Sequence, residues 1–326
     1  MSQTFPQSAT HLLIPFAAVS SEAAAQHLQG LKLPNLRQLL DTLTLVDSDI
    51  GSDASFSPPH ERALAKAHGL PVVDGYIPWA AQEAAKLGID GAHSAAWGCV
   101  SLCNYFVGTG SMTLEDPALL QVTEAESRQL LADMTRYFVE DGITLHYVAP
   151  THWLACGEPL KNIPTASLDR VVGRNLDAWQ PEGQPAAKLR RLQNEMQMLL
   201  YTHTVNDARS RARAAVINSI WLHGTGELTR LESKVSANIA TPRNLADAAL
   251  KEDWSVWAKA WAQLDATLCA DWLKRVQAGE PFTLTLCGER SALTYECLPK
   301  SGLERLKSSF KSIFGLQPAY LLPQQL

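Results

Sequence analysis

Apolar segments with the composition of buried strands alternate with amphipathic helical segments along most of the chain. Residues 11–19, 143–149, 216–222 and 282–287 have strand patterns, and apolar residues at helical spacing lie between them. Alternation of this kind predicts an α/β fold in which a mostly parallel sheet has helices on both of its faces. It is the strongest constraint that the sequence places on the fold.

Local signals mark the ends of the helical segments. Pro34 and Pro59 each stand where a helix would begin, because the first turn of a helix does not need their missing N–H group. Thr123 and Glu126 form a capping box at the start of a helix that we expect to end at Gly142. Further helices are predicted over residues 186–203, 253–276 and 301–315, whereas residues 47–59 are expected to form a loop and residues 70–110 short helices and loops.

The composition indicates a globular protein. Of the 326 residues, 46% are hydrophobic and 19% are charged, which is typical of a chain with a sizeable core. The formal net charge is −5 and no long block of Lys or Arg occurs, so we expect no nucleic-acid partner. No segment approaches the length of a membrane span, and the N-terminus lacks the basic region of a signal peptide, so we expect no membrane association. The six cysteines form no CxxC pair, which favours reduced thiols and a cytoplasmic location.

Two polar segments, near residues 108–118 and 204–214, flank a block with a helix–strand–helix pattern. We therefore expect residues 108–204 to form a smaller inserted block. On this prediction, residues 1–107 and 205–326 together form the α/β core.

Several groups of reactive or aromatic residues have an ordinary structural interpretation. The tryptophans between Trp254 and Trp272 recur at helical spacing, which favours a buried helix face over a stacking platform. Cys99 and Cys103 lack a second pair that would complete a zinc site, so we expect buried thiols. Dispersed histidines, without the spacing of a metal site, stand at positions 11, 27, 60, 68, 93 and 146.

Ser52 lies close in sequence to Asp47, Asp49 and Asp53. Carboxylates near a serine could hold a metal ion beside a nucleophile. The same residue types are also the usual formers of turns. We favour the turn, and Ser52 is a catalytic candidate only if the protein is an enzyme.

A second candidate site combines a helix end with a glycine-rich segment that we expect to be a turn after a strand. Glycine lets a backbone approach a ligand closely, and backbone N–H groups can hold an anion. We therefore predict a weak site for a small anionic or phosphorylated ligand. The alternative, slightly favoured, is that Asn206 and Arg209 only hold the loop between helix and strand. The candidate ligand-binding residues are His203, Asn206, Arg209, His223, Gly224 and Gly226.

Several segments resemble known families. HTVNDAR at 203–209 and VINSIWLHGTG at 216–226 together resemble a stretch of the archaeal-type cofactor-independent phosphoglycerate mutases. LPNLRQLL at 33–40 resembles the Pro-Asn-Leu helix that follows the first strand in the alkaline phosphatase superfamily, and IPTASLDRVVGR at 163–174 stands where the mutases carry an Asp-Pro-His segment. Over nearly the full chain, the sequence more closely resembles bacterial RpfE-type regulatory proteins, through PVVDGYIPWAA, EDGITLHY, PTASLDRVVGR and LRRLQNEMQMLLYTH. This resemblance implies an alkaline phosphatase-like core.

The chain departs from the mutase pattern where the mutases bind metal. Their first strand ends in an Asp-Gly that supplies a ligand, whereas residues 15–19 here read Pro-Phe-Ala-Ala-Val. Their late strand ends in Asp-His, whereas the resemblance places Gly288, Glu289, Arg290 and Ser291 at the corresponding turn here. Arginine cannot replace histidine as a ligand, because it stays protonated and has no lone pair to give.

The resemblance with these departures implies a degenerate phosphoglycerate mutase-like protein that is independent of metal and of other cofactors. The leading hypothesis is a non-catalytic regulatory or ligand-binding protein, with a small anionic or phosphorylated ligand or a protein as its partner. The alternative is a phosphoglycerate mutase or phosphatase that acts on a small phosphorylated metabolite through a changed site around Ser52, His203, Asn206, Arg209 and His223. A scaffold that uses only its surface is a third hypothesis.

Overall fold

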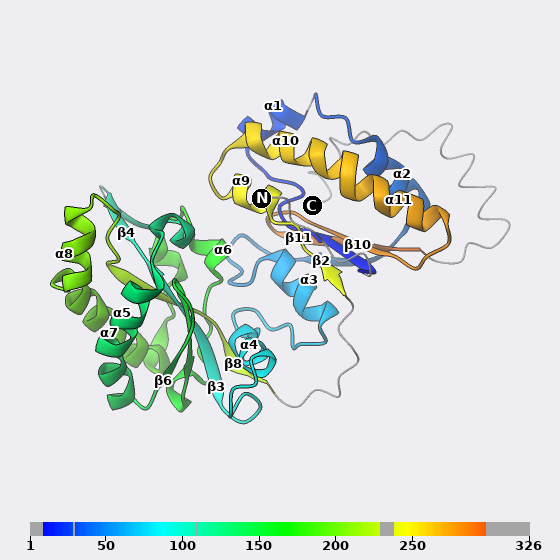
Figure 1. Cartoon of the computed structure of the whole chain (residues 1–326). Helices are drawn as coiled ribbons and strands as arrows, with labels where there is room; N and C mark the ends of the chain where they lie inside the picture. The colour runs from blue at the N-terminus through cyan, green and yellow to red at the C-terminus, as the bar shows by residue number, and fades with distance from the viewer. Residues whose placement is uncertain (1–8, 29, 109, 229–237, 298–326) are drawn as a thin grey trace. The chain divides into compact units, whose positions relative to one another are not determined.

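The computed structural model describes residues 9–28, 30–108, 110–228 and 238–297 of the chain. The chain divides into two compact units. The first unit comprises residues 1–53, 58–68 and 235–326, and the second comprises residues 54–57 and 69–234. Each unit has its own sheet (Figure 1). Each also has its own apolar core.

The first unit contains a mixed five-stranded sheet in the order β2-β11-β10-β1-β9. Only β1 with β10 and β1 with β9 run parallel among the described strands, whereas β10 with β11 and β11 with β2 run antiparallel. The expectation of a mostly parallel sheet is therefore not confirmed, because a short hairpin joins β10 to β11 and reverses the chain. The strands are β1 (His11–Ile14), β2 (Thr44–Ile50), β9 (Ile239–Ala240), β10 (Thr283–Cys287) and β11 (Ser291–Glu296).

Helices lie on both faces of the β1–β10 pair. Leu12 and Leu284 lie on one face, in a core that includes the predicted tryptophan stripe, where Trp257 and Trp261 are fully buried. On the other face, Leu13 packs against α3 (Pro59–Ala67). The helices of the larger core are α1 (Glu22–Leu28), α2 (Pro34–Thr42), α9 (Asn244–Ala249), α10 (Trp254–Leu264) and α11 (Ala270–Gln277), with a π-helical segment, Asp265–Cys269, between the last two.

The second unit contains an antiparallel four-stranded sheet in the order β6-β7-β3-β8, and a separate hairpin of β4 and β5. Helices α5 and α7 pack on one face of the larger sheet through a large apolar core, and α4 packs on the other face. The strands are β3 (Ala96–Cys103), β4 (Tyr105–Gly108), β5 (Ser111–Leu114), β6 (Thr144–Ala149), β7 (His152–Cys156) and β8 (Ser219–Glu227). The helices are α4 (Trp79–Lys86), α5 (Glu124–Glu140), α6 (Leu168–Val171), α7 (Gly183–Tyr201) and α8 (Thr204–Arg211), with short 3₁₀ turns at Pro117–Leu120, Glu158–Leu160 and Leu176–Trp179.

The helices predicted within the described residues are present, but α1, α8 and α9 were not predicted, and other errors concern strands. The capping box of Thr123 and Glu126 is present, and α2 and α3 begin at Pro34 and Pro59. Residues 47–50 belong to β2 rather than to a loop, and the region over residues 70–110 contains β3, which was not predicted. Every residue of β3 is buried, so the strand lacks the polar–apolar alternation that identifies a half-buried strand. The helix predicted over residues 301–315 lies outside the described residues.

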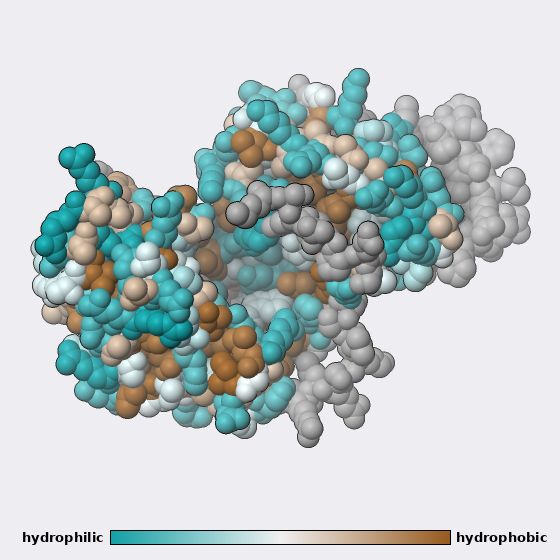
Figure 2. All heavy atoms as spheres, in the orientation of Figure 1, coloured by the Kyte–Doolittle hydropathy of each residue, from teal (hydrophilic) through white to brown (hydrophobic). Residues whose placement is uncertain are grey.

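The predicted inserted block, residues 108–204, lies within the second unit, which reaches further in both directions. Strands β3 and β8 belong to that unit because β3 pairs with both β7 and β8. None of the helices in the described part of the chain combines the length and apolar character needed to cross a membrane. On the face drawn in Figure 2, apolar residues stand in small groups among hydrophilic ones.

Candidate functional site

The candidate residues from the sequence fall into three separate places. Ser52 and the turn at residues 288–290 lie at one edge of the sheet of the first unit. His203, Asn206 and Arg209 lie at or in α8 of the second unit. His223, Gly224 and Gly226 lie in β8 of the same unit.

The carboxyl ends of β1 and β10 share one edge of the sheet in the first unit, because Ile14 is opposite Leu286 in the parallel pair. The backbone that follows β1 is held by indole groups. Trp257 Nε1 donates to the carbonyl oxygen of Phe16 at 2.9 Å, and Trp261 Nε1 donates to that of Ala17 at 3.1 Å. The segment after β1 is thus fixed by hydrogen bonds to a packed helix, and it carries no carboxylate.

The turn after β10 is a hairpin with local polar contacts. The backbone N–H of Gly288 donates to the carbonyl oxygen of Ser291 at 2.9 Å. Glu289 Oε2 accepts from the backbone N–H of Ser20 at 2.8 Å and from the Ser20 hydroxyl. Arg290 lies 3.7 Å from the carboxylate of Asp53, and both side chains are exposed, so this ion pair contributes little to stability.

Ser52 lies at this same edge. The neighbouring Gly51 donates its N–H to the carbonyl oxygen of Arg290 at 2.9 Å, and Ile50 pairs with Ser291. The Ser52 side chain belongs to an exposed residue. The structure therefore places the exposed serine beside the turn at residues 288–290.

The carboxylates around Ser52 do not converge on one point. Asp47 pairs with Lys66 at 2.7 Å, and Asp49 pairs with the buried Arg62 at 2.7 Å. Asp53 pairs with Arg290 on the β10–β11 turn. Each of these carboxylates thus has its own cationic partner, which argues against a shared metal site. The turn interpretation does not hold for Asp47 and Asp49, because both belong to β2.

His203 and Asn206 have structural hydrogen bonds at the start of α8. His203 Nδ1 accepts from the backbone N–H of Val205, and its Nε2 lies 3.0 Å from a carboxylate oxygen of Asp133. The Asn206 amide donates to the carbonyl oxygens of Leu200 and Ile217 at 2.8 and 2.6 Å, and accepts from the N–H of Ile217 at 2.9 Å. Asn206 therefore ties the end of α7 to the segment that enters β8.

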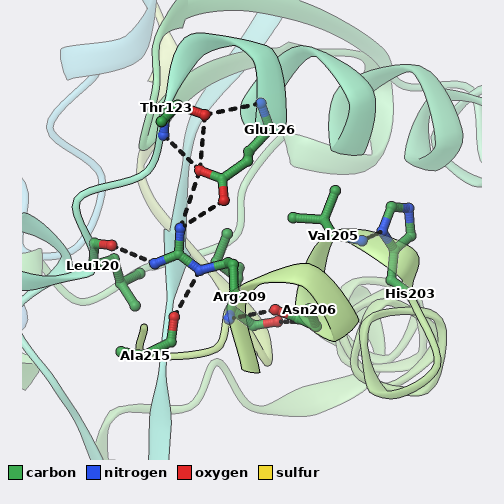
Figure 3. Close-up of polar contacts among 9 residues, drawn as sticks. Leu120, Thr123, Glu126, His203, Val205, Asn206, Arg209 and Ala215 are labelled. Atoms are coloured by element: carbon green, nitrogen blue, oxygen red, sulfur yellow. Dashed lines mark hydrogen bonds and ion pairs between the residues drawn. The ribbon is translucent and has the colours of Figure 1, made fainter. Parts of the chain in front are cut away.

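Arg209 is 4% exposed and directs every branch of its guanidinium to protein atoms (Figure 3). Its Nε donates to the carbonyl oxygen of Ala215 at 2.7 Å, and one terminal nitrogen contacts both oxygens of Glu126 at 3.0 and 3.1 Å. The other terminal nitrogen donates to the carbonyl oxygen of Leu120. This geometry supports the interpretation in which Arg209 holds loops, and anion binding by it stays a prediction.

The predicted anion site requires Arg209 and His223 to lie close together. Asn206 is bonded to Ile217 at the start of β8, whereas His223 stands further along the strand. Six residues of extended chain span roughly 20 Å at about 3.3 Å per residue, so α8 and His223 do not share one cleft.

The expectation that residues 223–226 form a turn is wrong, because they continue β8. A side chain at Gly226 would have its Cβ 2.9 Å from Cβ of Pro78, so close packing on the segment before α4 accounts for this glycine. Gly224, with φ of 60°, lies against Trp79 and Cys99 in the same way.

The sheet of the second unit brings a further set of polar side chains together on the face covered by α4. Cys99 and Ser101 are two residues apart on β3, so they point to the same face. His223 on β8 stands opposite Cys99, and His152 on β7 stands opposite Ser101. Helix α4, which packs on all three strands, adds Glu83.

These side chains contact one another directly. His152 Nε2 lies 2.8 Å from a carboxylate oxygen of Glu83, and His223 Nε2 lies 3.0 Å from the hydroxyl oxygen of Ser101. The sulfur of Cys99 and one ring nitrogen from each histidine all lie within 4.8 Å of one another. Cys99 is buried, whereas the side chains of His152 and Glu83 are 25% and 36% exposed, so the group can be reached from solvent.

The surroundings set the charge of two members of this group. The hydrogen bond with His152 keeps the pKa of Glu83 below its usual range. Burial opposes this shift, and electrostatic attraction to His152 adds to it. Burial, together with the neighbouring His152, lowers the pKa of His223 to about 3. His223 is therefore a neutral imidazole at pH 7, able to accept at one ring nitrogen and donate at the other.

Sequence reasoning did not identify this group. Cys99 was expected to be a buried thiol, which it is, and His223 was assigned to an anion site with Gly224 and Gly226. No spacing rule connects Cys99, His152 and His223, which come from three different strands. A strand prediction for β3 would have placed Cys99 and Ser101 on one face, and that was the signal available in the sequence.

Comparisons with known proteins found distant structural similarity. No protein-family model matches the chain, and the search of curated proteins found no match. A cofactor-independent phosphoglycerate mutase from Thermoplasma acidophilum DSM 1728 is similar in structure, with 13% identity and a TM-score of 0.36 over 97% of this chain and 98% of that one. The PH0037 protein from Pyrococcus horikoshii is similar with 13% identity and a TM-score of 0.42, over 89% of this chain and 87% of that one. Neither similarity is close enough to support an argument about activity.

Proposed function

We propose that the chain is a non-catalytic regulatory or ligand-binding protein with a degenerate phosphoglycerate mutase-like site. The observation that supports this proposal is the edge of the first unit where β1 and β10 end. There, Trp257 and Trp261 hold the segment after β1, and Glu289 is bonded to Ser20. The regulatory role and the cytoplasmic location rest on the sequence resemblance to RpfE-type proteins and on the use of cysteine.

The chemistry of this edge explains why catalysis would be lost. An in-line phosphoryl transfer of the mutase type uses two metal ions to stabilise the attacking and leaving oxygens. Such a pair needs several carboxylate and imidazole ligands directed at common points. Here Asp49 and Asp53 are each paired with arginine, and Arg290 stands where the resemblance places a histidine.

An assay of phosphoglycerate interconversion tests the proposal. The full chain is incubated with 3-phosphoglycerate and Mg²⁺, Mn²⁺, Co²⁺ or Zn²⁺, and formation of 2-phosphoglycerate is followed through enolase. We expect no metal-dependent turnover above that of a heat-denatured sample. Binding of 3-phosphoglycerate or inorganic phosphate without turnover, measured by calorimetry, supports a ligand-binding role for the protein.

A second candidate function is a phosphoglycerate mutase or phosphatase that acts through Ser52. The position of this exposed serine at the carboxyl edge of the sheet favours it. Metal-dependent turnover that disappears in Ser52→Ala, and persists in the matched exposed variant Ser210→Ala, would establish this alternative and reject the leading proposal. The loss would follow because a hydroxyl nucleophile cannot be replaced by a methyl group.

A further inference from the structure

We propose that Cys99, His152 and His223 form a binding site for a divalent transition metal ion, with Zn²⁺ as the ion that the ligands favour. The site lies wholly in the second unit and is independent of the degenerate edge of the first unit. It departs from the sequence prediction of a metal-independent protein, which rested on the missing mutase ligands of the first unit and on the spacing of cysteines and histidines along the chain.

The register of three adjacent strands builds the site. Cys99 is directly opposite His223 across β3 and β8, and His152 enters from β7 opposite Ser101. Tetrahedral zinc with bonds of about 2.3 Å to sulfur and about 2.0–2.1 Å to nitrogen places its ligand atoms about 3.4–3.6 Å apart. The three ligand atoms lie within 4.8 Å of one another. Small side-chain rotations that move these atoms by about 1 Å would therefore bring them to the distances that an ion requires.

Each histidine also has a second partner of the kind that orients a metal ligand. His152 Nε2 is bonded to Glu83 and His223 Nε2 to Ser101, and if these bonds are kept, Nδ1 of each ring is the nitrogen left for the metal. In metal sites, the outer ring nitrogen of a ligating histidine is almost always bonded in this way, and the bond sets both the tautomer and the ring direction.

The space beside the sulfur is provided by Gly224. A Cβ at this position would stand 3.5 Å from the sulfur of Cys99 and 3.1 Å from Cβ of Trp79. The glycine thus lets β8 and α4 approach the thiol from two sides without a side chain between them. The sequence analysis assigned Gly224 to an anion site. In the structure, the absence of a side chain at Gly224 lets its backbone pack against Cys99 and Trp79.

The ligand types decide which metals suit the site. One thiolate and two imidazoles are soft and borderline ligands that favour zinc or copper over Mg²⁺ or Ca²⁺. Binding converts the Cys99 thiol to a zinc thiolate and releases its proton to solvent. The group supplies three protein atoms, so a tetrahedral ion has a fourth position for water or for Glu83, which lies on the solvent side.

Metal titration of the full chain, purified without a histidine tag and stripped with a chelator, tests the proposal. We expect about one Zn²⁺ per chain with a dissociation constant below about 1 μM, measured against a chromophoric chelator, since three-ligand zinc sites bind tightly. Substitution with Co²⁺ should give a thiolate-to-metal charge-transfer band and the visible absorption of tetrahedral cobalt. Copper is tested in the same titration.

Variants assign the ligands. Cys99→Ser should remove the charge-transfer band, and His152→Ala should weaken Zn²⁺ binding at least as much as Glu83→Gln, for which we expect a loss of about 10–100-fold. Cys156→Ser and His146→Gln are matched controls, a partly exposed thiol and a half-buried histidine of the same sheet, and they should leave binding unchanged.

Three results would overturn the site: binding weaker than about 100 μM in the wild-type chain, a cobalt spectrum without a thiolate band, or a band that survives Cys99→Ser. The wild-type cobalt spectrum decides the question even if Cys99→Ser does not fold. Zinc that supports mutase turnover and is unaffected by Cys99→Ser would instead support the catalytic alternative in the first unit. The two proposals therefore fail through different measurements.

Discussion

Replacement of Arg209 by methionine separates a structural role of this residue from a ligand-binding role. The variant keeps an unbranched side chain of similar length but removes all guanidinium donors. The carbonyl oxygens of Leu120 and Ala215 then lose a buried donor, and Glu126 loses its cation. If these hydrogen bonds of Arg209 hold the second unit together, the Arg209→Met variant of that unit must be much less stable.

The magnitude follows from these partners. A buried acceptor that loses its donor costs about 1–3 kcal/mol, and two carbonyl oxygens are affected. Glu126 keeps its bonds to Thr123 and is 24% exposed, so its carboxylate adds less than a fully buried charge would. We therefore expect a loss of about 3–5 kcal/mol, as for other broken buried ion pairs.

Native-state hydrogen exchange is the suitable assay, because the two units need not unfold together. Amides of α5 and β8 should exchange about 10²- to 4 × 10³-fold faster in Arg209→Met, which corresponds to the expected change in free energy at about 1.4 kcal/mol per factor of ten. Arg211→Met is a matched control on the same helix. Arg211 is exposed and donates to the carbonyl oxygen of Asp207 on its own helix, so we expect a change within about 0.5 kcal/mol. A change below about 1 kcal/mol in Arg209→Met, accompanied by loss of phosphate binding, would refute the structural interpretation.

Two further predictions concern the first unit. Burial, reinforced by a neighbouring histidine, lowers the pKa of His11 to about 4, so the unfolded state binds its proton first as pH falls. Stability should therefore fall between about pH 6.5 and pH 4 by up to about 3 kcal/mol, and urea unfolding across this range should show a smaller loss in His11→Gln. Asp265 in the π-helical segment accepts from the backbone N–H of Leu36 at 2.7 Å and thereby caps α2 from a distance. Asp265→Ala should cost about 2 kcal/mol in urea unfolding, whereas Asp265→Asn, which keeps an acceptor, should cost less; equal losses would contradict the capping role.

The sequence by itself determined the helix starts and the buried helix face, because interactions between residues close in sequence produce them. The capping box of Thr123 and Glu126 and the proline at the start of α2 predicted helix starts within a residue or two. The tryptophan stripe predicted the buried face of α10 and α11 because side chains at helical spacing share one side of a helix. These signals depend on neighbours a few residues away, so they can be read without the fold.

Only the tertiary structure decided the direction of the strands, the identity of β3 and the partners of the candidate residues. The sequence names Arg209 as a candidate residue, but its contact with Leu120 comes from a distant part of the chain. Cys99, His152 and His223 meet because β3 pairs with two strands in one particular register. A shift of β3 by one residue would turn Cys99 to the face opposite His152 and His223, and no local pattern specifies that register. Contacts between distant segments are set by how the strands pair and pack, and this is why the group at Cys99 became visible only in the folded chain.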